Sequence, residues 1–507
     1  MHSLRTALAL ALLAGGGMAA LPAQANVTLP AILSDNMVIQ RNMPIHIWGH
    51  ADPGEQVTVT LMGDKASAVA GPDGQWQAAL KPHAAGGPYT LSVTGKNTVT
   101  LSNVLIGDLW LCSGQSNMEF TLRRASTATA AIAASADPGL RFFKVHTAKP
   151  TSPADDVQGA WTVSGPDTAG AMTAVGYFFG RDLRKAEHIP IGLISSNVGG
   201  TPAQSWTRAG ALAANPDLTR RYVALDSANQ AKHDAAMAAY TTALAAAKAA
   251  GTKEPTKPFG FWPSSVLYNG MIAPLVRLPI EGVLWYQGES NSHDPEGYRT
   301  LLPTMINDWR AQWSEPALPF LLVQLAPFGS HEGGDTAWAK TREAQTETAR
   351  TLPHAGIAVI TDLGLQDNIH PTNKEPVGDR LALLARKQVY GEKELVAEGP
   401  TYRAMQSVGS KIRVTFDNVG DGLTIRGGEA SAVPVPADRL VGFTIAGPDG
   451  QFVPAEAKIV GKDTVEVSAP QVPQPKAVRY GFVNFPVVNL WNKNGLPANP
   501  FRTDHAQ

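Results

Sequence analysis

Between residues 109 and 360 the chain repeats one pattern, in which a short apolar run is followed by a segment with helical periodicity. The apolar runs are Leu109–Cys112, Ile191–Ile194, Val283–Tyr286, Phe320–Leu325 and Ile357–Ile360. The helical patterns are Tyr298–Trp313, Trp338–Thr351 and Val377–Tyr390. Strands that are apolar throughout need cover on both faces, so this alternation predicts a parallel sheet with helices on each side. We therefore expect an α/β fold with three layers.

Segments with a β pattern flank this region on both sides. Residues 26–105 alternate apolar and polar positions, as in Gln56–Leu61, and turn signals such as Gly71–Gly74 punctuate them. We expect a small β-sandwich there. The α/β domain is then assigned to residues 106–395, and a second β region to residues 396–507, with strands such as Lys411–Phe416 and Thr464–Val467.

An alanine- and lysine-rich stretch, Ser227–Lys257, interrupts the α/β pattern. Alanine has the highest helix propensity, and a glycine often ends a helix, so we predict an exposed helix that ends near Gly251. We interpret residues 205–265 as a helical insertion between two units of the core, over the mouth of a site.

The first 25 residues have the features of an export signal. Arg5 precedes the apolar stretch Ala7–Ala14, and Ala23–Ala25 provides a small-x-small cleavage site. The apolar stretch is too short to cross a bilayer. We therefore expect a Sec-type signal peptide and a periplasmic or secreted protein with no membrane insertion after signal removal. A buried N-terminal helix is the alternative.

The charge balance and the metal-ligating residue types exclude several functions. The chain has 42 lysines and arginines against 43 aspartates and glutamates, without basic clusters, which argues against a nucleic-acid partner. The one cysteine, Cys112, permits no internal disulfide and no cysteine-based zinc site. His46 and His50 lie on a strand pattern, unlike a helical zinc motif. We predict no metal and no cofactor, and no pattern specifies an oligomeric state.

Polar clusters follow four of the five apolar runs. They are Ser113–Asn117, Ser195–Thr201, Gln287–Asn291 and Asp367–Pro371. One such cluster alone would be an ordinary polar turn. Because ligands bind beyond the carboxyl ends of parallel strands, four clusters at one edge predict a convergent site.

Ser116 is the candidate nucleophile of this site. A serine needs a neighbouring base, and the base needs a third group that fixes its tautomer. Asp367 and His370 are three residues apart in a loop before a predicted helix, so the carboxylate can reach one imidazole nitrogen while the other faces Ser116. Asp362, directly at its strand end, is the alternative carboxylate.

An acyl-transfer site also needs N–H donors for the developing oxyanion. The candidates are the backbone N–H groups of Ser116 and of Gly199 or Gly200, and a side-chain amide from Gln287 or Asn291. Glycine suits this place because it leaves room for the substrate. A tight turn is the alternative interpretation of the glycine pair.

These blocks resemble those of the SGNH hydrolase superfamily, and in particular the sialate O-acetylesterase family of carbohydrate esterases. The residues that carry the resemblance are Gly114–Met118, Val198–Ala203, Trp285–Asn291, Asp367–Pro371, Leu33–Val38, Asn489–Asn492 and Gly495–Pro497. The resemblance implies an SGNH-type three-layer core, a Ser116–His370–Asp367 triad and hydrolysis of acetyl esters on sugars. The usual SGNH asparagine in a Gly-x-Asn context is replaced here by Gln287 or Asn291.

The resemblance further implies an O-acetylated carbohydrate as substrate, either sialate or a plant cell-wall glycan. The candidate substrate-binding residues are Gln115, Asn117, Glu289, Asn269 and Trp206. A structural hydrogen-bonding carboxylate is the alternative role for Glu289.

Other classes of protein fit the residues less well. An α/β-hydrolase would have a Gly-x-Ser-x-Gly elbow, but Met118 stands at the position of its last glycine. Cys112 lies inside an apolar strand, which argues against a thiol nucleophile. A non-catalytic carbohydrate-binding or adhesive protein on a hydrolase scaffold is the alternative from a different class. The presence of Ser116, Asp367 and His370 favours the esterase.

Overall fold

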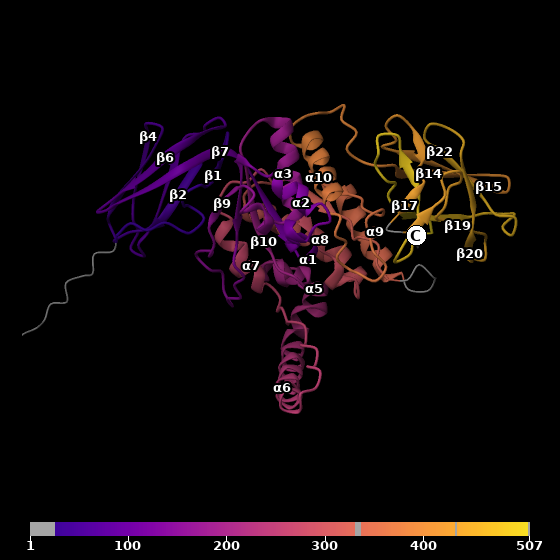
Figure 1. Ribbon diagram of the computed structural model, residues 1–507, viewed down its shortest axis with the longest axis horizontal. Helices are drawn as coiled ribbons and strands as arrows, with labels where there is room; N and C mark the ends of the chain where they lie inside the picture. The colour runs from indigo at the N-terminus through magenta and orange to yellow at the C-terminus, as the bar shows by residue number, and fades with distance from the viewer. Residues whose placement is uncertain (1–25, 330–335, 431–432, 505–507) are drawn as a thin grey trace, which may run out of the picture.

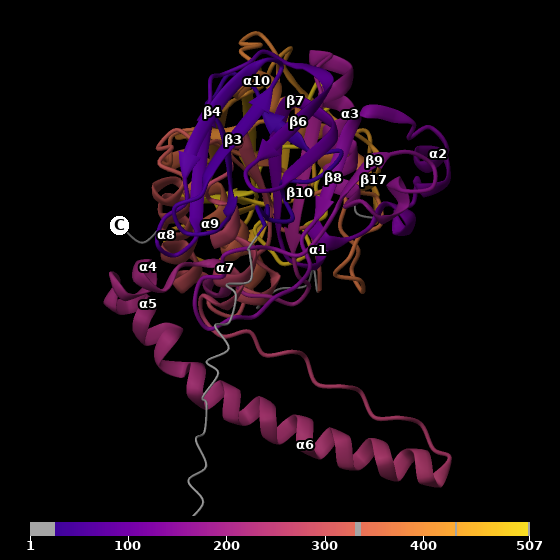
Figure 2. The same ribbon diagram turned by 90° about the vertical axis from the view of Figure 1, so that its left-hand side faces the viewer.

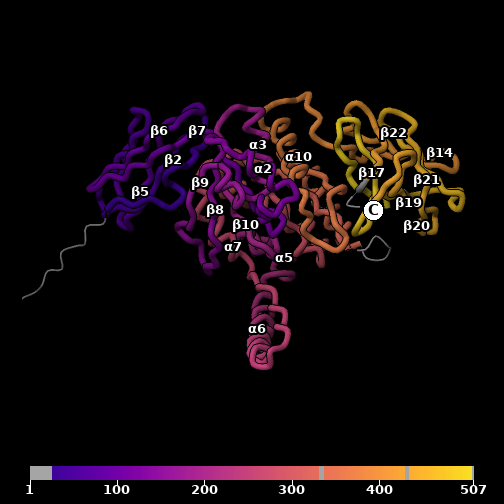
Figure 3. The backbone as a smooth tube through the Cα atoms, viewed as in Figure 1, coloured from indigo at the N-terminus to yellow at the C-terminus, as the bar shows by residue number. Residues whose placement is uncertain are grey.

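The computed structural model describes residues 26–329, 336–430 and 433–504, so the predicted signal peptide lies outside the described residues. The molecule is elongated, with an N-terminal β region at one end, a central α/β part and a C-terminal β region at the other end (Figure 1). The backbone trace shows the same order of parts along the chain (Figure 3).

A mixed sheet forms the centre of the molecule. Its strands lie in the order β13 (Ala355–Ala358), β12 (Phe320–Val323), β11 (Gly282–Tyr286), β7 (Thr98–Gly114), β10 (Ile191–Asn197), β8 (Asp137–Lys144) and β9 (Trp161–Ser164). Neighbours from β13 to β8 pair in parallel, and β9 pairs with β8 in the antiparallel direction. The five predicted strands are confirmed, whereas β8 and β9 extend the sheet beyond the prediction.

Helices cover both faces of the central sheet. On one face, α3 (Ala174–Glu187) and α10 (Glu375–Gln388) pack together over Trp110 and Leu284. On the other face, α8 (Pro295–Gln312) and α7 (Val266–Met271) pack over the sheet, and the ring of Trp309 contacts that of Trp285. Helix α9 (Ala337–Thr351) lies beside α8. The shorter helices are α1 (Ser116–Glu119), α2 (Ala128–Ala133), α4 (Ala209–Ala213) and α5 (Pro216–Arg221).

Strand β7 connects the N-terminal β region to the central sheet. Its first half pairs with β6 (Gly86–Thr94), and its second half pairs with β10 and β11. The predicted boundary at residue 105 therefore falls inside one continuous strand. The other strands of this region are β1 (Val38–Gln40), β2 (Ile45–His50), β3 (Gln56–Leu61), β4 (Asp64–Val69) and β5 (Gln75–Leu80).

The C-terminal region consists of small antiparallel sheets around an apolar core of its own, which includes Ile412, Val465 and Tyr480. One four-stranded sheet contains β14 (Thr401–Val408), β15 (Lys411–Asp417), β22 (Thr464–Ser468) and β21 (Glu456–Ile459). The other contains β20 (Phe452–Pro454), β19 (Phe443–Ala446), β23 (Ala477–Tyr480) and β25 (Phe501–Arg502). The two-stranded sheets are β16 (Leu423–Ile425) with β24 (Leu490–Asn492), and β17 (Gly428–Ala430) with β18 (Val433–Val435).

The alanine-rich stretch forms the long helix α6 (Asp226–Ala250). The helix ends at Gly251, whose φ of 64° is the left-handed C-cap that was predicted. We call α6 and the returning residues 251–262 the arm. It projects away from the body instead of lying over it (Figure 2). In the described ranges, no helix has both the length and the apolarity needed to cross a bilayer.

Candidate active site

The turn between β7 and α1 presents Ser116 at the carboxyl edge of the central sheet. Gly114 has a φ of 129°, and a Cβ atom there would lie 2.2 Å from the carbonyl oxygen of Tyr286. Only glycine therefore allows β7 to approach β11 this closely and still turn. The Oγ atom of Ser116 lies 2.8 Å from Nε2 of His370. The structure thus brings together the two residues predicted as nucleophile and base.

His370 lies in the loop between β13 and α10. Its backbone N–H donates to Oδ1 of Asn368 at 2.9 Å. Burial, and then the positive charges of Lys374 and Arg124, hold the pKa of His370 below its ordinary value. The imidazole is therefore neutral at neutral pH, and Nε2 can accept the Ser116 proton.

The two candidate carboxylates differ in their surroundings. Asp362 forms a bidentate ion pair with Arg380, with oxygen–nitrogen distances of 2.7 and 2.8 Å, so its carboxylate is already committed. Asp367 is exposed. Within the described part of the chain, no carboxylate forms a hydrogen bond or an ion pair with His370. The geometry therefore shows a serine–histidine pair, with Asp367 three residues away in the same loop.

Asn117 connects the nucleophile turn to the histidine loop. Its Nδ2 donates to the carbonyl oxygen of Ile369 at 3.0 Å and to Oε1 of Glu289 at 2.6 Å. Its Oδ1 accepts from Nζ of Lys374 at 2.5 Å. Asn117 is 1% exposed and anchors the loop on both sides of His370. Its predicted contact with substrate stays a prediction.

Lys374 was not predicted as part of the site, although it follows His370 by only four residues. Its ammonium group is enclosed and lies 5.1 and 5.2 Å from the ring centroids of Phe120 and Tyr286. Burial lowers the pKa of Lys374 to about 7. Burial also raises the pKa of Glu289, which is 8% exposed. Its bond to Asn117 supports the structural role rather than the predicted sugar contact.

The glycine turn after β10 lies against the nucleophile. A Cβ atom on Gly199 would be 3.3 Å from Cβ of Ser116. The N–H of Gly199 donates to Oε2 of Glu119 at 2.8 Å. Glu119 was also missed, although it lies three residues after Ser116, the spacing of neighbours on a helix. Within the residues described, the N–H groups of Ser116 and Gly200 donate no hydrogen bond.

The predicted amide donors are used elsewhere. Nε2 of Gln287 donates to Oδ1 of Asn291 at 2.8 Å and to Oε1 of Gln115 at 3.2 Å. Nδ2 of Asn291 donates to Oε1 of Gln204 at 3.0 Å. Gln115, Gln287 and Asn291, the three predicted site residues in this network, are all buried. In this structure Gln287 and Asn291 hold strand ends together, and Oε1 of Gln115 belongs to the same network. The oxyanion role of the two amides and the substrate contact of Gln115 stay predictions.

Trp206 and Asn269 lie apart from Ser116. Trp206 is fully buried, donates through Nε1 to Oγ1 of Thr201 at 2.9 Å, and packs on Trp285. The Trp206 side chain fills the core in this structure, and its predicted contact with substrate stays a prediction. Asn269 is 7% exposed and lines a separate cavity of about 440 Å³ beside α6.

The structure contains an inert cysteine in the strand that carries Ser116. Burial raises the pKa of Cys112 to about 12, so its thiol stays protonated and is a poor nucleophile. Across the described residues, no three histidine, cysteine, aspartate or glutamate side chains are grouped to hold a metal ion.

Comparison with known proteins gives the family. A family model described as "Carbohydrate esterase, sialic acid-specific acetylesterase" matches residues 106–386. The chain belongs to this family. Mouse sialate O-acetylesterase is 30% identical over 435 residues, which cover 76% of this chain and 78% of the mouse protein. Human sialate O-acetylesterase is 31% identical over 407 residues, covering 73% and 72% of the two chains.

A solved structure is similar to this protein over nearly its whole length. The crystal structure of a carbohydrate acetylesterase from Xanthomonas citri has a TM-score of 0.81 and 38% identity, and the match covers 95% of this chain and 100% of that chain. Its coverage includes both β regions as well as the central sheet. This member of the carbohydrate esterase family is a carboxylic ester hydrolase.

Proposed function

We propose that the protein is an exported SGNH-type carbohydrate O-acetylesterase that works through a Ser116 acyl-enzyme. The observation that carries the proposal is the 2.8 Å contact between Ser116 Oγ and Nε2 of a histidine whose pKa is lowered. The names of the relatives, sialate O-acetylesterase and carbohydrate acetylesterase, support an acetylated sugar as the substrate.

The reaction follows from this geometry. Nε2 of His370 accepts the proton of Ser116 as Oγ attacks the acetyl carbonyl carbon. The protonated imidazole then donates this proton to the sugar oxygen, which leaves as the hydroxyl group. A water molecule, deprotonated by His370, then attacks the carbonyl carbon of the acetyl-enzyme. The bond from this carbon to Ser116 Oγ breaks, Oγ takes the proton back from His370, and acetic acid is released.

The backbone supplies the proposed oxyanion hole. The free N–H of Ser116 and the N–H groups of Gly199 and Gly200 are the donors in this proposal. Glu119 accepts the Gly199 N–H in the structure, so its carboxylate must turn away when the oxyanion forms. The sequence predicted these backbone donors together with a side-chain amide from Gln287 or Asn291, and the proposal keeps the backbone donors.

Asp367 is the carboxylate that we propose for the third position of the triad. Asp362 is held by Arg380, which leaves Asp367 as the acidic residue of the histidine loop. Its side chain is exposed in the structure and forms no described bond to His370, so the proposal requires its carboxylate to reach Nδ1 of His370 during turnover.

Hydrolysis of p-nitrophenyl acetate tests the proposal. We expect a burst of p-nitrophenol from the wild-type protein, and Ser116→Ala or His370→Ala should lower kcat by about four to six orders of magnitude. Ser126→Ala, at an exposed serine nearby in the chain, is the control and should keep full activity. Wild-type turnover by Ser116→Ala would refute the proposal. Export is tested separately, because the N-terminus of the secreted protein should be Asn26.

A further inference from the structure

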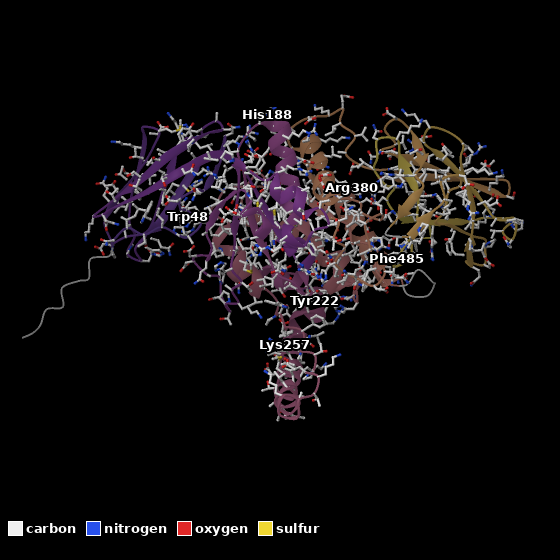
Figure 4. The ribbon with its side chains drawn as sticks, in the orientation of Figure 1. Trp48, His188, Tyr222, Lys257, Arg380 and Phe485 are labelled. Carbon is white, nitrogen blue, oxygen red and sulfur yellow. The ribbon has the colours of Figure 1, made fainter. Side chains whose placement is uncertain are left out.

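A cavity of about 520 Å³ opens where the arm joins the body, next to the active site. Its walls come from the turn after β10, the start of α6 and residues 260–262. Figure 4 places Tyr222 at this junction, and Lys257 farther out on the arm. Small-molecule sites usually have volumes of about 300–1,000 Å³, so the cavity is large enough to be one.

The cavity begins close to the nucleophile. A Cβ atom on Gly199 would lie 3.3 Å from Cβ of Ser116, and Gly200, the next residue, lines the cavity. With about 3.8 Å between consecutive Cα atoms, Cα of Gly200 lies within about 9 Å of the Ser116 Cβ. No described atom would lie within 4 Å of a Cβ atom on Gly200. A ligand that reaches Ser116 can therefore extend past Gly200 into the cavity.

Several polar side chains in the cavity carry groups that have no protein partner. Gln204 is fixed because its Oε1 accepts from Asn291, but its Nε2 donates no hydrogen bond within the described structure. The side chains of Asn229 and His293 form no hydrogen bond among the residues described. Groups of this kind can bind the hydroxyl groups of a ligand, since they both donate and accept.

The charged groups of the cavity already bond within the protein. Nε of Arg221 bonds to Asp217 at 2.8 Å, and its NH1 group bonds to Asp294 at 2.8 Å. Asp226 accepts the N–H of Ser264 at 3.1 Å. A ligand consequently meets neutral donors and acceptors, which favours an uncharged, hydroxyl-rich molecule over an anion.

An aromatic surface accompanies these polar groups. Trp262 is half-buried, and Nζ of Lys149 covers one face of its ring at 3.6 Å from the centroid. Its indole N–H donates no hydrogen bond to a described residue. Trp262 also packs against the apolar core, and the part of its ring that lines the cavity can contact the C–H groups of a sugar ring while the indole N–H bonds a hydroxyl group.

Hydrogen bonds within the protein hold one side of the cavity wall in place. The Asp294 side chain caps α8 by accepting the N–H of Gly297 at 3.1 Å, and it also accepts the hydroxyl of Tyr222 at 3.1 Å. A preformed wall lowers the entropy lost on binding.

From these observations we propose that the cavity binds a neutral sugar unit of an oligosaccharide whose acetylated unit lies at Ser116. The preferred substrate is then an acetylated oligo- or polysaccharide with uncharged units, and the base of the arm determines this specificity. The inference rests on the esterase function proposed above.

Chain-length dependence tests this proposal. The substrates are randomly O-acetylated xylose, xylotetraose, glucose and cellotetraose, O-acetylated N-acetylneuraminic acid, and p-nitrophenyl acetate. We expect kcat/KM to be at least about tenfold higher for a tetrasaccharide than for its monosaccharide in one neutral series. Trp262→Ala and Asn229→Ala should each lower the ratio of kcat/KM for the tetrasaccharide to that for the monosaccharide by about tenfold. Both variants should keep their activity on p-nitrophenyl acetate within about twofold of wild type.

Phe259→Ala provides the matched control, because this aromatic residue is on the same returning segment but is 94% exposed and does not line the cavity. It should leave both activities unchanged. The proposal is overturned if neither neutral series gains from chain length, if the acetylated sialic acid is the best sugar substrate, or if Trp262→Ala keeps the full advantage. Unchanged turnover by Ser116→Ala would instead refute the esterase mechanism, so the two failures are distinguishable.

Discussion

Asn117 shows how a residue next to the nucleophile can position the loop that carries the base. It bonds to the backbone before His370 and to Lys374 after it, so Ser116 and the loop that carries its base are positioned by one side chain. Lys374 has a second effect, because its charge disfavours the protonated form of His370. Position and protonation state of the base are thus set by the same buried contacts.

Replacing Lys374 tests this electrostatic effect. Lys374→Met removes a positive charge that lowers the pKa of His370, so that pKa should rise. Since the base must be neutral, less of it is active at a given acidic pH, and the acidic limb of kcat/KM should move to higher pH. Arg124→Met should move it the same way but less, because Arg124 is exposed and screened by solvent. An acidic limb that stays in place or moves to lower pH would contradict this account.

Asp367→Asn tests the third member of the proposed triad. Loss of the carboxylate should leave the tautomer of His370 unfixed and lower kcat by about three to four orders of magnitude. Asp362→Asn is the matched change, and it should lower the thermal midpoint by weakening the pair with Arg380 while kcat stays near the wild-type value. A kcat of Asp367→Asn within about tenfold of wild type would leave Ser116 and His370 as a catalytic pair.

At the scale of elements, the sequence predicts those that carry their own local signal. Apolar runs predict the five parallel strands, and Gly251 marks the end of α6. Helix α3 is missed because Gly176 and Gly180 lower its helix propensity. Both glycines bring the helix close to the sheet, since a Cβ atom on either would lie within 3.0 Å of a side chain.

For the candidate site too, the sequence predicts only the residues that carry a local signal. Ser116 and His370 follow from motif chemistry and from their common sheet edge. The roles of Gln287 and Trp206 do not, because their partners are set by three-dimensional packing rather than by spacing along the chain. Such contacts join residues far apart in sequence, as Asn117 and Lys374 do.

The arm should be dispensable for folding and for the chemical step. Helix α6 buries only Ala247 among its residues, so most of its length adds little apolar burial. Replacing residues 236–258 by a short Gly/Ser linker keeps Asn229 and Trp262, and it should change the thermal midpoint by only a few degrees. Turnover of p-nitrophenyl acetate should also be kept, since the removed residues contact neither Ser116 nor His370. A tenfold loss of that turnover would show that the distal arm supports the active site.

At the scale of the whole molecule, the two β regions are attached in different ways. The N-terminal region shares the backbone of β7 with the central sheet. The C-terminal region has its own core, and side-chain hydrogen bonds and ion pairs are among the contacts that join it to the α/β part. Nε2 of Gln324 donates to Oδ1 of Asn499 at 2.8 Å, and Glu343 binds Arg502 at 2.8 Å. We therefore expect single changes at these contacts to loosen the C-terminal region.

Among these contacts, we expect a change at Arg342 to loosen the C-terminal region most clearly. Its guanidinium group is fully buried, and it donates to the carbonyl oxygens of Val483 and Asn484. Because little solvent reaches the guanidinium group, burial lowers the pKa of Arg342 to about 9. Arg342→Met leaves the carbonyl of Val483 without a donor and leaves that of Asn484 with only the N–H of Phe328, at 3.3 Å. An unsatisfied buried carbonyl costs about 1–3 kcal/mol, and removal of the buried charge offsets part of this.

The net loss of unfolding free energy for Arg342→Met should be about 1–3 kcal/mol, measured by denaturant unfolding. Amide hydrogen exchange should become faster around residues 483–499, while kcat on p-nitrophenyl acetate should stay unchanged because Arg342 does not contact the catalytic pair. Arg350→Met, on the exposed side of the same helix, should alter none of these quantities. If Arg342→Met unfolded like the wild type, the docking of the C-terminal region would depend on its apolar contacts, since the polar ones would then contribute no net stability.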